Sequence, residues 1–292
     1  MSLPSMRGVR MHTTSLFQKL TWRFNLLRKA LYFPLEASWS DVLQEILSSH
    51  SPSYPPPLLL REEDDFGLYR VEDREVWFPL GFDPSFLTFV HNEIFVQRVY
   101  ERGRCQILPG DWVVDAGACE GFFSLYALEK GANVLAFEPV LAIAQALEKT
   151  LKRYIEGGRA KVYALALASE HAEKEILISS ANPGSNTIAQ VLIEQHTERV
   201  EASRKERVIT IPLDALLSSF DHPISFLKAD VEGSERELLL GARETIRRYK
   251  PCLSICTYHL PDDYREILRI VRSFGVGYRV KFSGLFDHLY AW

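Results

Sequence analysis

Acidic and glycine residues alternate in the segment Asp115-Ala-Gly117-Ala-Cys-Glu-Gly121. Gly117 permits a tight turn and lets a ligand approach the backbone closely, and Gly121 would let a following helix pack closely on the strand. The carboxylate of Asp115 suits a ligand with an ammonium group and hydroxyls better than one with a pyrophosphate, because like charges repel. The segment predicts a turn that binds a small molecule; a purely structural glycine turn is the alternative.

A second acidic residue, Glu138, follows Gly117 by 21 positions, in the tripeptide Phe-Glu-Pro. In nucleotide-binding α/β folds, an acidic residue at the end of the second strand accepts hydrogen bonds from ribose hydroxyls. A carboxylate has enough lone pairs to accept from both vicinal hydroxyls, and Pro139 suits the first turn of a following helix. The glycines lack the complete GxGxxG spacing, which disfavours a nicotinamide or flavin site.

Three carboxylates, Asp230, Glu232 and Glu235, follow another apolar segment. A helix dipole favours negative charge at the start of a helix, so capping explains Glu235. Asp230 and Glu232 would lie at the carboxyl edge of a strand, where open α/β sheets bind ligands, and Lys228 can neutralise part of their charge. We predict a functional role for Asp230.

A histidine, His259, ends the next apolar segment directly after Tyr258. Imidazole is the commonest general base near neutral pH. We predict that His259 takes a proton or contacts the substrate, with a structural role as the alternative.

The four cysteines, Cys105, Cys119, Cys252 and Cys256, form no CxxC pair. Cys252 and Cys256 lie in an expected strand, where four residues span roughly 13 Å. Two thiolates that far apart cannot share a zinc ion, because each Zn–S bond is only about 2.3 Å long. We therefore expect buried free thiols and no metal site, and the sequence leaves open whether a divalent ion assists.

Strands and helices alternate from residue 110 onward, which implies right-handed crossovers and a parallel sheet. The expected strands are 112–116, 133–137, 161–166, 225–229 and 252–258, and the expected helices are 122–129, 141–155, 234–249 and 262–274. An insertion carries two further strands, 175–178 and 208–212. A terminal hairpin of residues 278–282 and 288–292 would add an antiparallel edge.

The first hundred residues predict an appendage. Four residues share one face of an expected helix that can dock on its own domain, on a partner or on an anionic membrane: Phe17, Leu20, Phe24 and Leu27. A proline-rich linker, residues 51–57, follows. Residues 67–79 then read as a hairpin, and 86–100 as a helix.

The 292 residues are 47% hydrophobic and 25% charged, with a formal net charge of -4. Nucleic-acid binding needs a concentrated basic surface, so we expect no nucleic-acid partner. No apolar run is long enough for an integral membrane segment, and no secretory signal is visible, so we expect a cytoplasmic protein. A homo-oligomer is compatible with this composition.

Five segments together resemble the FkbM-type methyltransferases: DAGACEGFFSLYAL, FEPV, ITIPLDALL, FLKADVEGSERELLLGA and PCLSICTYHLPDDYREIL. The likeness covers residues 90–292 in the family's order and spacing. The Lys-x-Asp-Val-Glu-Gly-x-Glu stretch is its most specific element. Cys119 departs from the family, which usually has Asn there.

The resemblance implies an α/β fold with a Rossmann-like methyltransferase sheet of seven strands, mostly parallel, with the last strand antiparallel. We expect three parts: a helical segment and linker (1–57), a hairpin and helix leading into the core (58–109), and the methyltransferase domain (110–292). The N-terminal parts form a helical and hairpin appendage.

The resemblance further implies transfer of the methyl group of S-adenosylmethionine to a hydroxyl oxygen of a small-molecule or sugar-like acceptor. The residues predicted to bind this cofactor are Asp115, Gly117, Ala118, Gly121, Glu138, Pro139, Ala166 and Asp230. His259 and Asp230 are the predicted catalytic residues, and Glu232, Tyr258 and His259 the predicted substrate contacts. The competing interpretations are an NAD-type oxidoreductase and a non-catalytic nucleotide-binding protein of the same fold.

Overall fold

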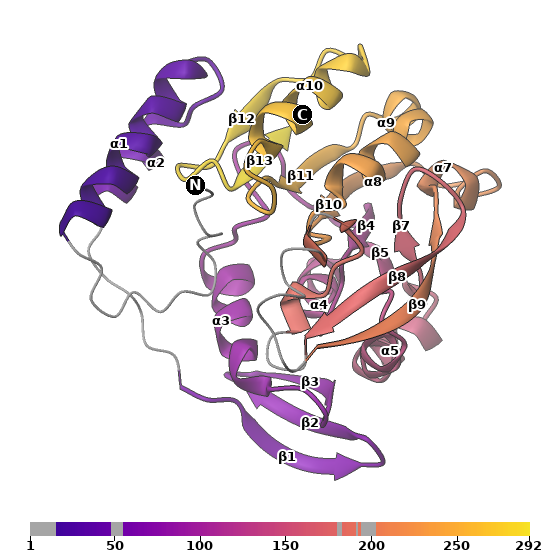
Figure 1. The fold of residues 1–292 in the computed structure, drawn as a ribbon. Helices are drawn as coiled ribbons and strands as arrows, with labels where there is room; N and C mark the ends of the chain where they lie inside the picture. The colour runs from indigo at the N-terminus through magenta and orange to yellow at the C-terminus, as the bar shows by residue number, and fades with distance from the viewer. Residues whose placement is uncertain (1–15, 48–54, 180–182, 191, 194–202) are drawn as a thin grey trace.

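A seven-stranded sheet forms the centre of the computed structural model, which describes residues 16–47, 55–179, 183–190, 192–193 and 203–292 (Figure 1). The strands, in their order across the sheet, are Val280–Phe282 (β12), His288–Ala291 (β13), Cys252–Cys256 (β11), Ile224–Ala229 (β10), Trp112–Ala116 (β4), Asn133–Phe137 (β5) and Ala160–Tyr163 (β6). Strands β11 to β6 pair in parallel, whereas β13 is antiparallel to both neighbours. The predicted seven-stranded, mostly parallel α/β fold is confirmed.

Helices cover both faces of this sheet because both faces are apolar (Figure 1). Val113 belongs to one core and Val114 to the other, as the two-residue period of a strand requires. The first face is covered by Phe122–Glu129 (α4) and Leu141–Glu156 (α5), and the second by Leu213–Leu216 (α7), Glu235–Gly241 (α8), Arg243–Tyr249 (α9) and Asp263–Ser273 (α10).

The predicted helix 234–249 is two helices, α8 and α9, with Ala242 between them. A Cβ atom on Gly241 would lie only 2.0 Å from the carbonyl oxygen of Ala168. The end of α8 therefore lies against a neighbouring backbone segment, where only glycine leaves enough room. The single-helix prediction was wrong because it placed Gly241, a residue that weakens a helix interior, inside one helix.

The C-terminal hairpin adds an antiparallel edge to the sheet, as predicted, with β13 on its inner side. Its last strand, β13, pairs with β11 on one side and with β12 on the other. All four residues of β13 are buried, as suits an internal strand. The antiparallel pairing was predicted correctly, but the outermost strand is β12.

The segment predicted as one strand, 161–166, is divided between two sheets. Strand β6 ends at Tyr163, and Ala166–Leu167 (β7) pairs in parallel with Ser203–Ile211 (β9). Strand β9 also pairs antiparallel with Ala172–Ser179 (β8). Both strands of the insertion therefore exist, longer than predicted, and they form a second sheet with β7.

A three-stranded antiparallel sheet precedes the core: Leu58–Glu63 (β1), Phe66–Val71 (β2) and Arg74–Pro79 (β3). It is fixed to α5, where Thr150 Oγ1 accepts a hydrogen bond from the Trp77 N–H at 2.9 Å. The hairpin prediction is confirmed, and β1 was missed. The predicted helix 86–100 was wrong in part, since Pro84–Phe86 (η1), Leu87–His91 (α3) and a π-helical turn, Asn92–Val96 (η2), replace it.

The N-terminal helices, Leu16–Tyr32 (α1) and Trp39–Leu47 (α2), dock beside β12 and α10. Phe282 N–H donates to the Glu36 carbonyl oxygen at 2.8 Å, and the Glu36 carboxylate pairs with Arg272. Several apolar residues of this segment are buried in the core that includes α10 and β12: Leu26, Ala30, Ala37 and Val42. The structure shows the expected docking of this segment on the chain's own domain.

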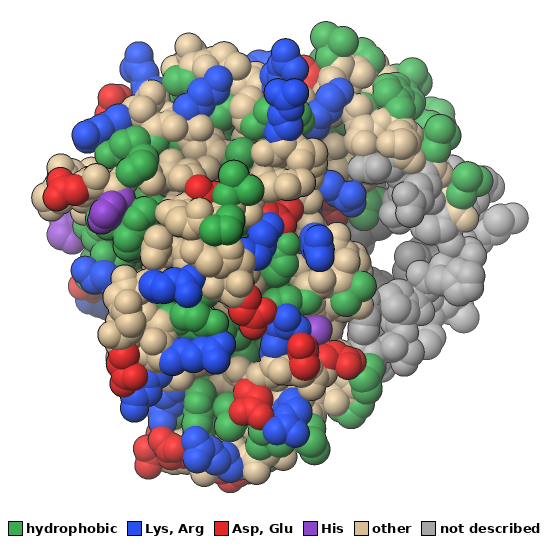
Figure 2. Space-filling model, turned by 180° about the vertical axis from the view of Figure 1, so that it is seen from behind, with side chains coloured by type: hydrophobic (Ala, Val, Ile, Leu, Met, Phe, Trp, Pro, Cys, Tyr) green, Lys and Arg blue, Asp and Glu red, His purple; other side chains and the backbone are tan. Residues whose placement is uncertain are grey.

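The predicted apolar face of α1 is exposed where its side chains are described, with Phe24 67% exposed and Leu27 37% exposed. The side chains of Phe17 and Leu20, and linker residues 51–54, lie outside the described part. Figure 2 shows hydrophobic side chains along the upper right, where α1 and α2 lie in that view. Within the described ranges, no helix is long and apolar enough to cross a bilayer.

Candidate functional site

The glycine turn joins β4 to α4 at the carboxyl edge of the main sheet. Gly117 has a φ of 76° and Gly121 a φ of 93°, a region that favours glycine. The N–H groups of Gly117 and Ala118 both donate to the Phe137 carbonyl oxygen at 3.0 Å. A Cβ atom on Gly117 would lie 1.9 Å from the Asp230 carbonyl oxygen. The turn therefore lies tightly between β5 and the loop after β10.

Gly121 gives α4 room beside another helix rather than beside the strand. A Cβ atom there would lie 2.5 Å from Leu147 Cδ1 of α5. The expected close approach exists, but its partner is α5.

Glu138 follows β5 and binds the backbone of the glycine turn. Its side chain is buried, and its two carboxylate oxygens accept hydrogen bonds from the backbone N–H groups of Cys119 (3.2 Å) and Val140 (2.9 Å). Burial raises the pKa of Glu138 to about 7, against the opposing effect of these hydrogen bonds. Each oxygen keeps a second lone pair for a ligand hydroxyl.

Asp115 belongs to an internal ion pair beneath the turn. Its side chain is fully buried, with Oδ1 lying 3.0 Å from Lys228 Nζ and Oδ2 accepting from Ser124 Oγ at 2.6 Å. Lys228 also donates to the Gly117 carbonyl oxygen at 2.6 Å. Burial alone would lower the pKa of Lys228, but the charges of Asp115 and Asp230 outweigh it and raise that pKa. Lys228 therefore contacts Asp115 directly, and its charge also acts on Asp230 as expected.

The three other predicted cofactor residues differ in position. Ala118 is buried within the turn, whereas Ala166 lies in β7, paired with Thr210 of the second sheet. Pro139 precedes Val140, the N-cap of α5, so it does not open that helix as predicted.

Asp230 joins the turn to a pair of tyrosines. Its carboxylate accepts from Tyr100 Oη at 2.6 Å and from Tyr258 Oη at 3.0 Å. Its backbone N–H donates to the Ala116 carbonyl oxygen of β4 at 3.1 Å. Residues from three separate parts of the chain thus meet at the carboxyl edge of β10.

His259 lies among three carboxylates. Its Nε2 is 3.5 Å from Asp230 Oδ1 and 3.3 Å from Glu232 Oε2, while its Nδ1 is 2.9 Å from Glu235 Oε1. Burial alone would lower the pKa of His259, but Glu232 and Glu235 outweigh it and raise that pKa well above its ordinary value. Burial also raises the pKa of Glu232.

Glu235, the first residue of α8, holds the loop that precedes this helix. Its carboxylate accepts from the backbone N–H groups of Val231 (2.9 Å) and Gly233 (3.1 Å), so it also fixes the loop after β10. The predicted residues Asp230, Glu232, Tyr258 and His259 are therefore brought together, with Glu235 among them.

Sequence reasoning missed two contributors to the site. Tyr100, which lies 130 positions from Asp230, carried no signal of its own. Glu120, inside the glycine turn, is buried, and burial raises its pKa to about 7.

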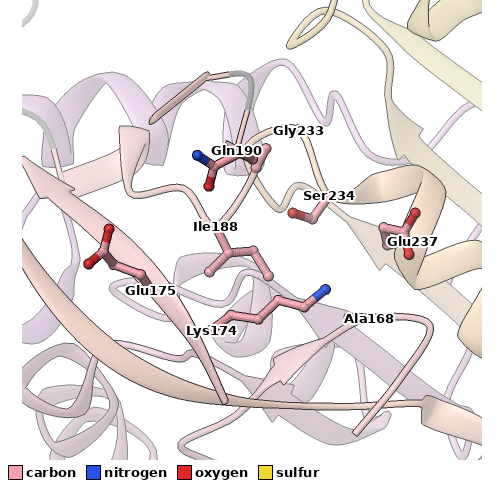
Figure 3. A pocket seen from close by; sticks show the side chains of 9 residues that line it. Ala168, Lys174, Glu175, Ile188, Gln190, Gly233, Ser234 and Glu237 are labelled. Carbon is pink, nitrogen blue, oxygen red and sulfur yellow. The ribbon is translucent and has the colours of Figure 1, made fainter. Parts of the chain in front are cut away.

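A cavity of about 430 Å³ opens between β8 and the start of α8 (Figure 3). Lys174, Ile188 and Ser234 are among its lining residues, and Gly233 reaches it from the loop that also carries Glu232. Its lining includes neither Gly117, Glu138 nor Asp230. The candidate site therefore lies beside this cavity and not in it.

The residues of the turn fit an adenosyl ligand that carries an ammonium group. Gly117 keeps side-chain atoms out of a crowded turn, and the Glu138 carboxylate lies under it with acceptor capacity left. Asp230, whose backbone lies against Gly117, adds a second carboxylate beside Tyr100. These features are the ones a nucleoside with two ribose hydroxyls and a cationic tail requires.

The Methyltransferase FkbM domain model matches residues 115–280, more than half of the 292 residues. The chain belongs to the FkbM methyltransferase family. Membership of this methyltransferase family implies S-adenosylmethionine as the methyl donor. The matched region begins at Asp115 and includes both the glycine turn and His259.

Curated relatives show the same likeness over part of their length. The chain is 31% identical over 183 residues to the 31-O-demethyl-FK506 methyltransferase FkbM of Streptomyces tacrolimicus, covering 53% of this chain and 68% of that protein. It is 27% identical over 176 residues to Methyltransferase 1 of Beauveria bassiana, covering 52% and 66%. It is 33% identical over 123 residues to the AMB antimetabolite synthetase AmbE of Pseudomonas aeruginosa, covering 41% of this chain but only 5% of that protein.

Among solved structures, the crystal structure of Methyltransferase FkbM from Methylobacillus flagellatus KT is similar, with a TM-score of 0.47 and 23% identity. The similarity covers 65% of this chain and 45% of that one.

Proposed function

We propose that this chain transfers the methyl group of S-adenosylmethionine to a hydroxyl oxygen of a small-molecule or sugar-like acceptor. The observation that carries the proposal is the position of Asp230. Its carbonyl oxygen lies against Gly117, and its carboxylate accepts from Tyr258. A donor at the glycine turn and an acceptor beside the tyrosines would therefore meet at this residue. The Streptomyces relative is named for methylation at an oxygen, which supports oxygen as the acceptor atom.

The residues around the turn would position the methyl donor. S-adenosylmethionine, when bound, supplies a methyl group on a sulfonium. An acceptor oxygen attacks the methyl carbon in line with the C–S bond, and the sulfur leaves. Correct placement of the two reactants supplies most of such catalysis. Glu138 would accept from the ribose hydroxyls, and Asp115 would act through Lys228, which holds the carbonyl oxygen of Gly117.

Asp230 is the stronger of the two candidates for taking the acceptor's proton. The Asp230 side chain is 17% exposed, whereas that of His259 is 4% exposed and faces carboxylates through both ring nitrogens. Asp230 can thus reach an acceptor, while His259 would position the carboxylates around it. As the new C–O bond forms, the C–S bond breaks, its electron pair stays on sulfur, and the hydroxyl proton passes to Asp230.

Transfer of an isotope-labelled methyl group tests this proposal. The intact chain would be incubated with methyl-¹³C S-adenosylmethionine and a panel of sugars and polyketide-like alcohols, and the product's methyl carbon located by NMR. We expect an O-methyl signal. Asp230→Asn should lower kcat by about 100- to 10,000-fold, with a smaller change in the acceptor KM. Glu237→Gln, at an exposed position outside the site, should keep wild-type rates.

A methyl group found on nitrogen or carbon would contradict the proposed acceptor atom. A kcat for Asp230→Asn within a few-fold of wild type would remove Asp230 as the proton acceptor, and the same assay on His259→Gln would then test the other candidate.

A further inference from the structure

Three potential metal-ligand atoms converge at the carboxyl edge of β10 and β11. They belong to Asp230, Glu232 and His259, and all lie within 4.8 Å of one another. His259 Nε2 is 3.5 Å from the nearest Asp230 oxygen and 3.3 Å from the nearest Glu232 oxygen. Both distances from Nε2 are longer than a charge-assisted hydrogen bond, which is usually about 2.7–2.9 Å.

The imidazole of His259 is buried, and its Nε2 lacks a hydrogen bond of normal geometry. Its side chain is 4% exposed, and within the described part of the chain Nε2 makes no hydrogen bond of normal geometry, whereas Nδ1 lies 2.9 Å from Glu235 Oε1. Buried polar atoms in folded proteins are almost always satisfied, so such an atom requires an explanation. Nε2 is directed at two carboxylates, so a cation between them would have three ligand atoms within reach.

A divalent cation has the size that these distances require. Metal–nitrogen and metal–oxygen bonds to first-row cations are about 2.0–2.2 Å long, which places neighbouring ligand atoms about 3.0–3.5 Å apart in tetrahedral or octahedral geometry. The separations of 3.3 and 3.5 Å match that range.

Glu235 orients the imidazole as metal sites require. Its Oε1 lies 2.9 Å from His259 Nδ1, and its carboxylate is itself held by the N–H groups of Val231 and Gly233. A proton on Nδ1 facing Glu235 leaves the lone pair of Nε2 directed toward Asp230 and Glu232. Metal-binding histidines commonly have this carboxylate partner on the second nitrogen.

We propose that Asp230, Glu232 and His259 bind one first-row divalent cation such as Mn²⁺ or Zn²⁺. One imidazole with two carboxylates suits these ions better than Ca²⁺, which takes six to eight oxygen ligands. Three protein ligands leave coordination positions open for an acceptor hydroxyl. The bound hydroxyl would lose its proton to Asp230 more easily. This catalytic role rests on the proposed function, whereas cation binding does not.

Titration of the intact chain with Mn²⁺ tests the site, with the EPR signal of unbound Mn²⁺ as the readout. Competition by Zn²⁺ for the bound Mn²⁺ is a second probe. We expect one saturable Mn²⁺ site per chain. Asp230→Asn, Glu232→Gln and His259→Gln should each weaken it at least tenfold. Glu235→Gln should weaken it about 10- to 100-fold through the orientation of His259. Glu237→Gln, an exposed glutamate of the same helix, should bind Mn²⁺ as wild type does.

S-adenosylhomocysteine binding by the same samples separates the two proposals. Wild-type protein that binds S-adenosylhomocysteine but neither Mn²⁺ nor Zn²⁺ overturns the cation site and leaves the methyltransferase proposal standing. Mn²⁺ affinity unchanged in Asp230→Asn and Glu232→Gln also overturns it. Variants that bind S-adenosylhomocysteine normally are folded, so their loss of Mn²⁺ would support these residues as the ligands.

Discussion

The carboxylate of Glu138 lies where the glycine turn meets the second strand, and it holds both through backbone hydrogen bonds to Cys119 and Val140. Because burial raises the pKa of Glu138 to about 7, its carboxyl group changes charge near neutral pH. A ligand whose hydroxyls donate to the charged form would lower that pKa. Binding and ionisation of Glu138 should therefore be linked.

Affinity for S-adenosylhomocysteine should fall as the pH is lowered from 8 to 6, because binding then requires loss of the Glu138 proton. Glu138→Gln should lack this pH-dependent step, since an amide does not titrate. At pH 8 the substitution replaces charge-assisted hydrogen bonds, each worth about 1.5–3 kcal/mol, so affinity should drop at least about tenfold. Calorimetric titrations across this range measure both effects. An identical pH dependence in wild type and Glu138→Gln would show that another group is responsible.

At the scale of single residues, the sequence predicted which side chains lie at the strand ends but not how they pair. Asp230 and His259 each follow an apolar strand, and that local signal was sufficient to place them at one edge. Their contacts with Tyr100 and Glu235 depend on tertiary packing over long sequence separations. Lys228 was interpretable as a charge partner, but only the sheet register places it opposite Asp115.

At the scale of elements, the glycine turn is the feature that most restricts substitution. Gly117 and Gly158 have nearly the same positive φ, 76° and 71°. A Cβ atom on Gly117 would meet the Asp230 carbonyl oxygen at 1.9 Å, whereas one on Gly158 would meet nothing within 4 Å. A side chain at either glycine would strain the backbone, but only at Gly117 would it also collide with another part of the chain.

Gly117→Ala should displace the loop after β10 and reduce S-adenosylhomocysteine affinity at least tenfold. Gly158→Ala should cost only the left-handed backbone strain of about 1–2 kcal/mol and leave that affinity unchanged. Urea unfolding and calorimetric titration of both variants provide the comparison. Equal behaviour of the two variants would mean that the close approach to Asp230 does not shape the site.

Elements with a strong local pattern were predicted to the residue, as for β4 and β5, whose apolar runs are bounded by polar turns. The errors occur where tertiary contacts decide the structure. Strand β7 leaves the main sheet because it pairs with β9, which is distant in sequence. The order of β12 and β13 at the sheet edge likewise has no local signal, since both are short apolar strands of one hairpin.

At the scale of the whole molecule, α1 and α2 complete a core rather than extend from it. Leu26 and Leu31 lie in the same helix, but Leu26 is 4% exposed and Leu31 is 70% exposed. Leu26 belongs to the core that includes Phe282 of β12. The division of the chain into 1–57, 58–109 and 110–292 therefore remains a proposal about sequence segments, not about independent folding.

Leu26→Ala should lower the free energy of unfolding by about 2–5 kcal/mol, as expected for a buried leucine. Leu31→Ala should change it by no more than about 0.5 kcal/mol, because that side chain is exposed. Urea unfolding of the intact chain measures both. If the two variants are equally stable, α1 does not pack on the core in solution.

The glycine turn, Glu138 and Asp230 meet at one edge of the sheet, and the central claim is that this edge binds S-adenosylmethionine. Calorimetric titration of the intact chain with S-adenosylhomocysteine, and separately with NAD, tests it most directly. We predict one bound S-adenosylhomocysteine per chain and no binding of NAD, with affinity for S-adenosylhomocysteine at least tenfold lower in Glu138→Ala. Folded protein that takes up NAD, or that does not bind S-adenosylhomocysteine, would contradict the assignment of this site.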